Sequence, residues 1–196
     1  GLRLSLRDVF AKTQGLLSVK REGTADDLLA FFIDRLKVAL RDRGLRHDLV
    51  EAAVEGDDDL GRIVARVEAL SSFLATEDGK NLLAGYKRAG NILKAEEKKG
   101  ALPSGTPVAM AGAPAQETAL IAAISLAEPE VARALQHEDF AGAMRALSGM
   151  RASVDAFFEG VLVNSEVAAE RENRLRLLAQ VRDAMGKVAD FSLVNG

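Results

Sequence analysis

The sequence contains no cysteine and no tryptophan, and it has only two histidines and one tyrosine. Without cysteine, disulfide bonds and thiolate metal sites are excluded, which fits the reducing cytoplasm where we expect the protein to work. Aromatic residues make up 5% of the chain, too few for the stacking platforms of sheet-based RNA-binding domains. No apolar run approaches the roughly 20 residues that a membrane-spanning helix needs, and no signal-peptide pattern opens the chain.

Strand patterns and excess positive charge are also missing. Period-2 alternation is almost absent, as are Asn-Gly and Asp-Gly hairpin turns, so a sheet is not expected. The net charge of the 196 residues is −3, and a general nucleic-acid binder would be basic, so any RNA contact must be local. The sequence begins in mid-pattern at Gly1, without an initiator Met, and we expect it to be part of a longer protein.

Helical spacing of apolar residues runs through most of the chain. It predicts helices over 4–14, 24–44, 47–55, 78–100, 138–148, 151–160 and 166–189. A further helix should begin at 57–59 and run past Leu74, and another should cover 116–127 and, after an interruption at Pro129, continue to about 136. Three of the four prolines lie in a segment that should form a flexible loop, 101–115. We therefore predict an all-α bundle of about seven or eight helices. Residues 1–23 form a helix and linker from a preceding domain, and 24–196 form one helical domain.

Sequence patterns of catalytic sites are not found. The stretch GYKRAG at 85–90 continues into Asn91 and lacks the Lys-Ser/Thr ending of a phosphate-binding loop. His47 and Asp48 resemble half of a helical metal site, but the other histidine, His137, lies in an unrelated segment. The carboxylate runs are explained by helix N-termini and solvated faces. We expect this chain to be non-catalytic by itself, with no metal site.

Two basic helix faces remain as candidate binding surfaces. In the segment 78–100, one face is apolar and the other carries Lys80, Lys87, Asn91 and Lys94 at helical spacing. From Lys80 to Lys99 six cations face two glutamates, a local excess of +4 in an acidic chain. The start of the last helix carries further basic and amide residues, Arg171, Asn173, Arg174 and Arg176. Such residues form either a solvated face with ion pairs or a surface for phosphates.

Several stretches together are similar to a known family. They are LLAFFIDRLKVALRDRGLRHDLVEA, RVEALSSFLATEDGKNLLAGYKRAGNIL, MRASVDAFFEGVLVN and ENRLRLLAQVRDAMGKVADFS. In order and spacing they resemble the C-terminal region of the beta subunit of bacterial tetrameric glycyl-tRNA synthetases, over essentially the whole chain. The second half also resembles the helical anticodon-binding domain, named after a DALR-like motif, that closes arginyl-tRNA synthetases. The sequence departs from the family at Ser153, where relatives often have proline, and in its Ala-, Pro- and Gly-rich loop.

The resemblance implies a function for the basic faces. It implies a domain that holds the anticodon arm of glycine tRNA, in a holoenzyme of two alpha and two beta subunits that uses ATP and Mg²⁺; this chain itself would hold no cofactor. The family's KR-x-x-NIL motif falls on Lys87, Arg88, Asn91, Ile92 and Leu93, the VDAFF motif on 154–158, and the NRL motif on 173–175. Together, the resemblance and the two basic faces predict these tRNA contacts: Lys80, Lys87, Arg88, Asn91, Lys94, Arg171, Asn173 and Arg174.

Arg174 is the contact on which this hypothesis depends most, because it should point outward from the bundle, about 100° from the buried Leu175. A different class of function stays open. The chain could be a non-catalytic helical module that docks onto another protein. Binding through phosphates would weaken steeply with salt, whereas an apolar docking face would be far less sensitive.

Overall fold

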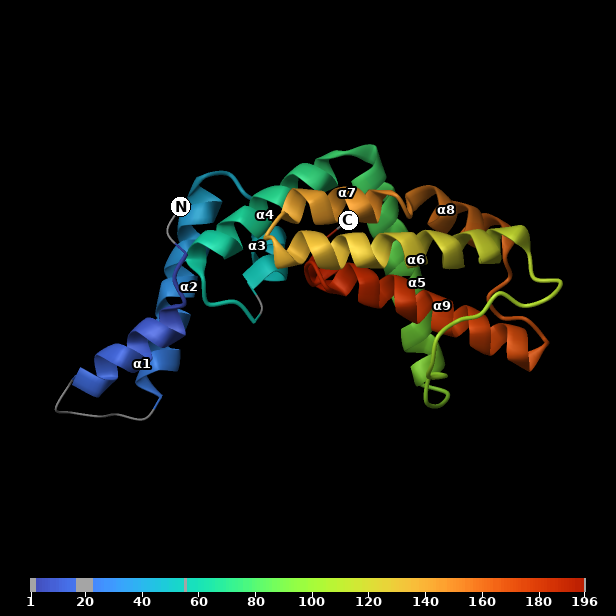
Figure 1. Cartoon of the computed structure of the whole chain (residues 1–196), viewed down its shortest axis with the longest axis horizontal. Coiled ribbons are helices and arrows are strands. Elements are labelled where there is room, and N and C mark those ends of the chain that lie inside the picture. The colour runs from blue at the N-terminus through green and yellow to red at the C-terminus, as the bar shows by residue number, and fades with distance from the viewer. Residues whose placement is uncertain (1–2, 17–22, 55, 196) are drawn as a thin grey trace.

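The computed structural model describes residues 3–16, 23–54 and 56–195. These residues form α-helices and a short 3-10 helix, η1, and no β-strand (Figure 1). The all-α prediction is therefore confirmed. The elements are α1 (Leu6–Leu16), α2 (Thr24–Asp42), α3 (His47–Val54), α4 (Leu60–Ala75), α5 (Glu77–Glu97), α6 (Ala115–Gln136), α7 (Phe140–Ser148), α8 (Arg151–Gly160), α9 (Ala168–Gly186) and η1 (Phe191–Leu193).

Side-chain caps begin several of these helices. Asp59 accepts a hydrogen bond from the Arg62 N–H and starts α4, and Thr76 accepts one from the Gly79 N–H and starts α5. Each cap satisfies an amide group that has no partner within the helix. The predicted interruption at Pro129 is wrong, because α6 continues through it. Pro129 is exposed while Ala127 and Val131 on either side of it are buried, so packing holds the helix together across the missing N–H donor.

The main hydrophobic core lies among α5, α6, α7, α8 and α9, with α3, α4 and η1 closing it. In Figure 1, α6 and α9 run side by side and α5 crosses them steeply. The largest fully buried side chains of this core include Phe157, Leu82 and Leu120, and Phe191 of η1 packs against Tyr86. A second, smaller core joins α2 to α3 and α4 through Leu40, Ala53 and Val67 among others.

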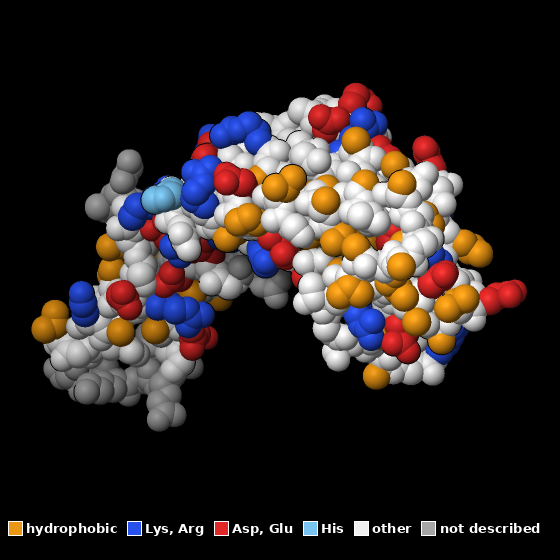
Figure 2. Space-filling view, turned by 45° about the vertical axis from the view of Figure 1, so that its right-hand side comes forward, with side chains coloured by type: hydrophobic (Ala, Val, Ile, Leu, Met, Phe, Trp, Pro, Cys, Tyr) orange, Lys and Arg blue, Asp and Glu red, His pale blue; other side chains and the backbone are white. Residues whose placement is uncertain are grey.

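The N-terminal helices project from one end of the bundle (Figure 1). α1 packs on α2, where the Phe10 and Phe32 rings stack with centroids 5.8 Å apart. The predicted domain boundary between residues 23 and 24 stays a prediction, and residues 17–22 of that predicted linker lie outside the described residues. In the space-filling view, positive and negative side chains are interspersed, and a hollow separates the N-terminal part from the bundle (Figure 2).

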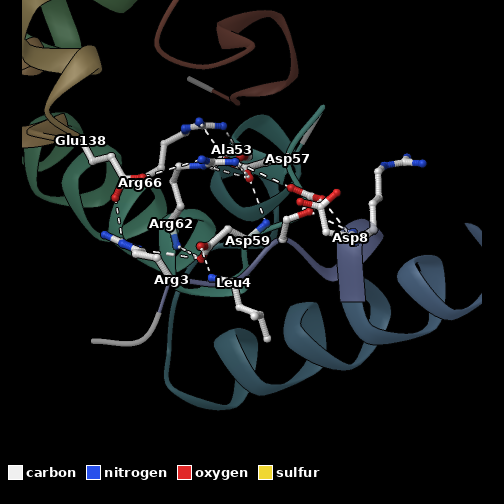
Figure 3. Close-up of polar contacts among 12 residues, drawn as sticks. Arg3, Leu4, Asp8, Ala53, Asp57, Asp59, Arg62, Arg66 and Glu138 are labelled. Atoms are coloured by element: carbon white, nitrogen blue, oxygen red, sulfur yellow. Dashed lines mark hydrogen bonds and ion pairs between the residues drawn. The ribbon is translucent and has the colours of Figure 1, made fainter. Parts of the chain in front are cut away.

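A network of charged residues fixes the N-terminal segment, the α3–α4 turn and the α6–α7 turn to one another (Figure 3). Arg62 donates to both oxygens of Asp57, at 2.6–3.0 Å, and Arg66 donates to the Ala53 carbonyl at 3.0 Å. Arg3 pairs with Glu138 at 2.8 Å, and the Leu4 N–H donates to Asp59. The acidic run at 57–59 is thus engaged in structural contacts.

The loop at 101–115 has no regular structure up to Pro114, as its prolines predict. It is nevertheless held against α9, because the Val108 N–H and carbonyl both bond to the Asn173 side chain and the Ser104 carbonyl accepts from Arg176 at 2.8 Å. Its flexibility stays a prediction. None of the described helices is long and apolar enough to span a bilayer.

Candidate nucleic-acid interface

Helix α5 has the two faces that its sequence predicts. Leu82, Leu83, Tyr86, Ala89 and Leu93 are buried in the main core. Lys80, Arg88, Asn91 and Lys94 are exposed, and Lys87 is half-buried. The cationic stripe therefore lies at the surface, on the side of the helix that faces away from the core. The well-packed apolar stripe fixes the orientation of the helix.

The cations of α5 differ from the others in the same part of the molecule. Among the described residues from Glu77 to Leu193, every Lys and Arg forms an ion pair except Lys87, Arg88, Lys94 and Lys98. All four lie on α5 or at its C-cap. Lys80 is paired with Glu77 at 2.8 Å. Cations without an internal partner are available to an anionic ligand, and here they are gathered on one helix.

Arg88 is held by an aromatic contact. Its guanidinium lies over the Phe158 ring of α8, 4.5 Å from the centroid, where the ring's electron-rich face attracts a cation. Arg88 and Phe158 line a shallow groove of about 330 Å³ together with Asn81, Asp155 and Glu159. The VDAFF motif thus supplies a buried core residue, Phe157, and next to it a platform for a surface cation.

A second groove, of about 430 Å³, lies between α5 and α9. We call it the α5–α9 groove; it is lined by Tyr86, Lys87, Gly90, Asn91, Lys94 and Glu97 of α5, Arg182 of α9 and Ser192 of η1. Burial, with a smaller contribution from Asp190, raises the pKa of the Tyr86 phenol, which favours its neutral form. Three cations face one carboxylate in the groove, and Asn91 adds an amide that can both donate and accept.

Arg171 lies apart from this groove. It pairs with Glu96, which also accepts from Lys99 at 2.8 Å. The hydrogen bond from Lys99 lowers the pKa of Glu96, burial opposes this, and the bond from Arg171 lowers it further. Arg171 and Arg176 line a third groove, of about 600 Å³, beside the 101–104 segment. Both of these cations are already engaged by carboxylates.

The expected outward direction of Arg174 is wrong. Its side chain is buried, with the residue 5% exposed, and Nε donates to Glu117 at 2.8 Å while Nη1 donates to the Leu162 carbonyl at 3.0 Å. Glu170 adds an ion pair at 3.2 Å. The residue before it, Asn173, is 1% exposed and donates to Glu117 at 2.8 Å. Both residues hold the fold together, and neither is accessible to RNA in this structure.

The physical reason lies in how α9 is covered. Helices α5 and α6 pack on it, and the 101–115 loop and the segment after α8 lie over its first turns. Its buried arc is therefore wider than the stripe that its leucines define. Glu117, which is 1% exposed in the first turn of α6, is the residue that sequence reasoning missed. An acidic residue at a helix start is ordinary, and no local signal separates Glu117 from the exposed ones.

Comparisons with known proteins point to one family. The family model described as DALR anticodon binding domain matches residues 82–191, from α5 to η1. The chain is 62% identical over 189 residues to the glycine–tRNA ligase beta subunit of Phenylobacterium zucineum (strain HLK1). It is 48% identical to the beta subunits of Rhodospirillum centenum (strain ATCC 51521 / SW) and of Ruegeria sp. (strain TM1040). These alignments cover 96–100% of this chain, and the chain spans 28% of the length of each relative.

Proposed function

The chain belongs to the DALR anticodon-binding domain family, and on this premise we propose that it holds the anticodon arm of glycine tRNA as part of a glycine–tRNA ligase beta subunit. The aminoacylation itself would take place in a cytoplasmic holoenzyme with the alpha subunit, using ATP and Mg²⁺. This chain would contribute binding and no catalytic residue. The similarity to beta subunits named for that reaction supports the proposal.

The observation that carries the proposal is the cluster of unpaired cations on α5. Lys87, Arg88, Lys94 and Lys98 have no carboxylate partner among the described residues, while Lys80, Lys99, Arg171 and Arg182 each have one. When a lysine without a partner binds a phosphate, the free-energy cost is small, since no internal ion pair is lost. The proposed contacts are therefore Lys87, Arg88, Asn91 and Lys94. Lys80 and Arg171 are also proposed, but each must first break its ion pair with a glutamate.

Phosphate contacts position an RNA without reading its sequence. They release condensed counterions, so the logarithm of the binding constant falls linearly with the logarithm of the salt concentration, by about 0.7 to 0.9 for each contact. A protein of net charge −3 can bind RNA only where its cations are concentrated, and the α5 face provides this concentration.

The test is a titration of glycine tRNA against the chain at several salt concentrations, with a non-cognate tRNA in parallel. For Lys87→Ala combined with Lys94→Ala, we expect weaker binding and a salt slope that is smaller by about 1.4 to 1.8. The matched control is Arg133→Ala combined with Lys187→Ala, which removes two cations that are ion-paired elsewhere on the bundle. Binding that does not depend on salt, or equal slopes for the two double variants, would contradict the proposal and favour an apolar docking module.

A further inference from the structure

The helix α5 contains three glycines, and two of them are explained by packing. A Cβ added to Gly79 would lie 2.1 Å from the Phe73 carbonyl oxygen, and one added to Gly85 would lie 2.5 Å from Cγ1 of Val154. In both places a neighbouring element approaches the helix so closely that a side chain cannot fit. These glycines allow the turn from α4 and the contact with α8.

The third glycine, Gly90, has no such explanation. A Cβ at this position would meet no protein atom within 4 Å. Its φ is not in the left-handed region, so the backbone does not require glycine either. Glycine inside a helix is less favourable than alanine. Neither packing nor backbone conformation therefore accounts for Gly90, and the open space above it belongs to the α5–α9 groove.

The residues around this space carry a specific combination of chemical groups. Lys87 and Lys94 lie about one turn to either side of Gly90 along α5, and Arg182 faces them from α9. Arg182 is weakly engaged by Glu97 at 3.9 Å and bonds to the adjacent Asp183. Asn91 is exposed next to Gly90, and its side-chain amide has no hydrogen bond to another described residue. The groove volume of about 430 Å³ lies within the range of about 300–1,000 Å³ usual for small-ligand sites.

A single phosphate would need only the cations. An unstacked nucleotide uses all of these groups, since its base has two flat faces and an edge with donors and acceptors, and its phosphate is anionic. Guanidinium planes stack on unstacked RNA bases, and side-chain amides read their edges. A flat base also needs a floor without a side chain, which a glycine provides.

We propose that the α5–α9 groove binds one unstacked nucleotide of an RNA loop, with the base lying over Gly90 against Arg182, its edge toward Asn91, and its phosphate near Lys87 and Lys94. The inference rests on the proposed function, because the RNA is taken to be the anticodon loop of glycine tRNA. It adds a site and a role for Gly90 and Arg182, which the family motif does not supply.

The test fills the groove without removing any charge. Gly90→Leu places a side chain over the floor, and Gly186→Leu is the matched control, since a Cβ at Gly186 of α9 also meets no atom within 4 Å. We expect Gly90→Leu to bind glycine tRNA about tenfold or more weakly, in keeping with the energy of stacking one base, and Gly186→Leu to bind like the parent. Circular dichroism and thermal melting confirm that both variants remain folded; Gly90→Ala, which should melt higher than the parent, shows that the helix accepts a side chain here.

A second measurement identifies the ligand as a base. Glycine tRNA transcripts in which one anticodon-loop base at a time is replaced by an abasic residue keep their phosphates. One replacement should weaken binding to the parent and have no further effect on Gly90→Leu. If the parent shows no salt-dependent binding of tRNA, both the proposed function and this inference fail. If the parent binds but Gly90→Leu binds equally well, or no abasic position matters to the parent, the inference alone is overturned.

Discussion

At the residue scale, Arg174 shows how a charge can be held inside a helical bundle. Its guanidinium contacts two carboxylates, Glu117 and Glu170, and the Leu162 carbonyl. The other oxygen of Glu117 accepts from Asn173. Burying an ion pair is tolerated when hydrogen bonds satisfy both partners, and removing one partner leaves the other charge buried and unpaired. The cluster therefore constrains α6, α9 and the segment after α8 to one arrangement.

Replacing Arg174 should destabilise the protein strongly. For Arg174→Ala we expect a loss of about 3–5 kcal/mol in the free energy of unfolding, because Glu117 is left buried without its cation. The control is Arg133→Ala, which removes an exposed i,i+3 pair with Glu130 and should leave the stability nearly unchanged, because solvent screens such a pair. Denaturant titration of the two variants measures both values. Equal stability of the two variants would show that the buried pair contributes nothing.

Asp57 links the stability of the protein to pH. Burial alone would raise the pKa of its carboxyl, but hydrogen bonds from Arg62 and the Asp59 N–H, with the charges of Arg62 and Arg66, hold it below its ordinary value. A carboxyl whose pKa is lower in the folded state stabilises the fold above its unfolded pKa of about 4. That stability is lost as the pH falls through the lower, folded value.

We therefore expect the melting temperature of the parent to fall below about pH 4, partly through Asp57. Asp57→Asn should lower the melting temperature at pH 7 and flatten its fall in acid, since the neutral amide has no proton to take up. Asp26→Asn serves as control, because the Asp26 pair with Arg7 is exposed on both sides. If the melting temperatures of Asp57→Asn and the parent fall in parallel in acid, Asp57 is not one of the groups responsible.

For one physical reason, the sequence predicted the outward direction of the α5 cations correctly and that of Arg174 incorrectly. The spacing within a helix places Lys87 and Lys94 opposite Leu82 and Leu93, and a face opposite a single core is exposed. It says nothing about how many neighbours cover a helix. α9 is covered on several sides, so Arg174 is buried although it lies away from Leu175 on the helix. The pairing with Glu117, 57 residues earlier, has no local pattern.

At the scale of the element, α5 combines tight packing at its start with an open surface in its middle. Gly79 lies under the Phe73 carbonyl and Gly85 under Val154, whereas Gly90 lies under open space. The helix is thus fixed against α4 and α8 by its first half and faces the α5–α9 groove with its second half. The sequence predicted this helix, but not the different roles of its glycines, which depend on neighbours outside the helix.

These glycines should respond oppositely to the same substitution. Gly79→Ala must displace the α4–α5 turn and should destabilise the protein by more than about 1 kcal/mol, since a backbone atom is in the way. Gly90→Ala should stabilise it by up to about 1 kcal/mol through helix propensity alone. Thermal melting of the two variants measures the difference. Destabilisation by Gly90→Ala would reveal a close contact that the structure does not contain.

At the scale of the whole molecule, the region matched by the family model is smaller than the unit that shares a core. Residues 82–191 contain α5 to η1, yet Leu49 and Ala52 of α3 and Phe73 and Leu74 of α4 belong to the same hydrophobic cluster. α1 and α2 contribute none of that cluster's buried residues. The second core, around Leu40 and Val67, joins α2 to the rest, and α1 packs on α2.

Truncation should distinguish the unit that shares the main core from the smaller region that the family model matches. A chain of residues 45–195 should melt cooperatively, at a lower temperature than the parent because the second core loses Leu40. A chain of residues 82–195 should not melt cooperatively, because the main core loses α3 and α4. Calorimetry and the near-ultraviolet dichroism of Tyr86 follow both. A cooperative transition of 82–195 at the parent's temperature would show that α3 and α4 are dispensable.

The contact of α3 with residues 190–195 has a consequence for the time course of folding during synthesis. The Asn195 N–H donates to Asp48 across 147 residues, and the Asp190 N–H donates to the Ala52 carbonyl. A ribosome adding about 5–20 residues per second needs roughly 7–30 s to cover that distance. One side of α3 can pack on α4 early, while the other side waits for the last helix and η1 to emerge. Throughout that interval the side of α3 that receives residues 190–195 stays uncovered. The nascent chain then depends on chaperones or on fast synthesis to keep this side from other hydrophobic surfaces.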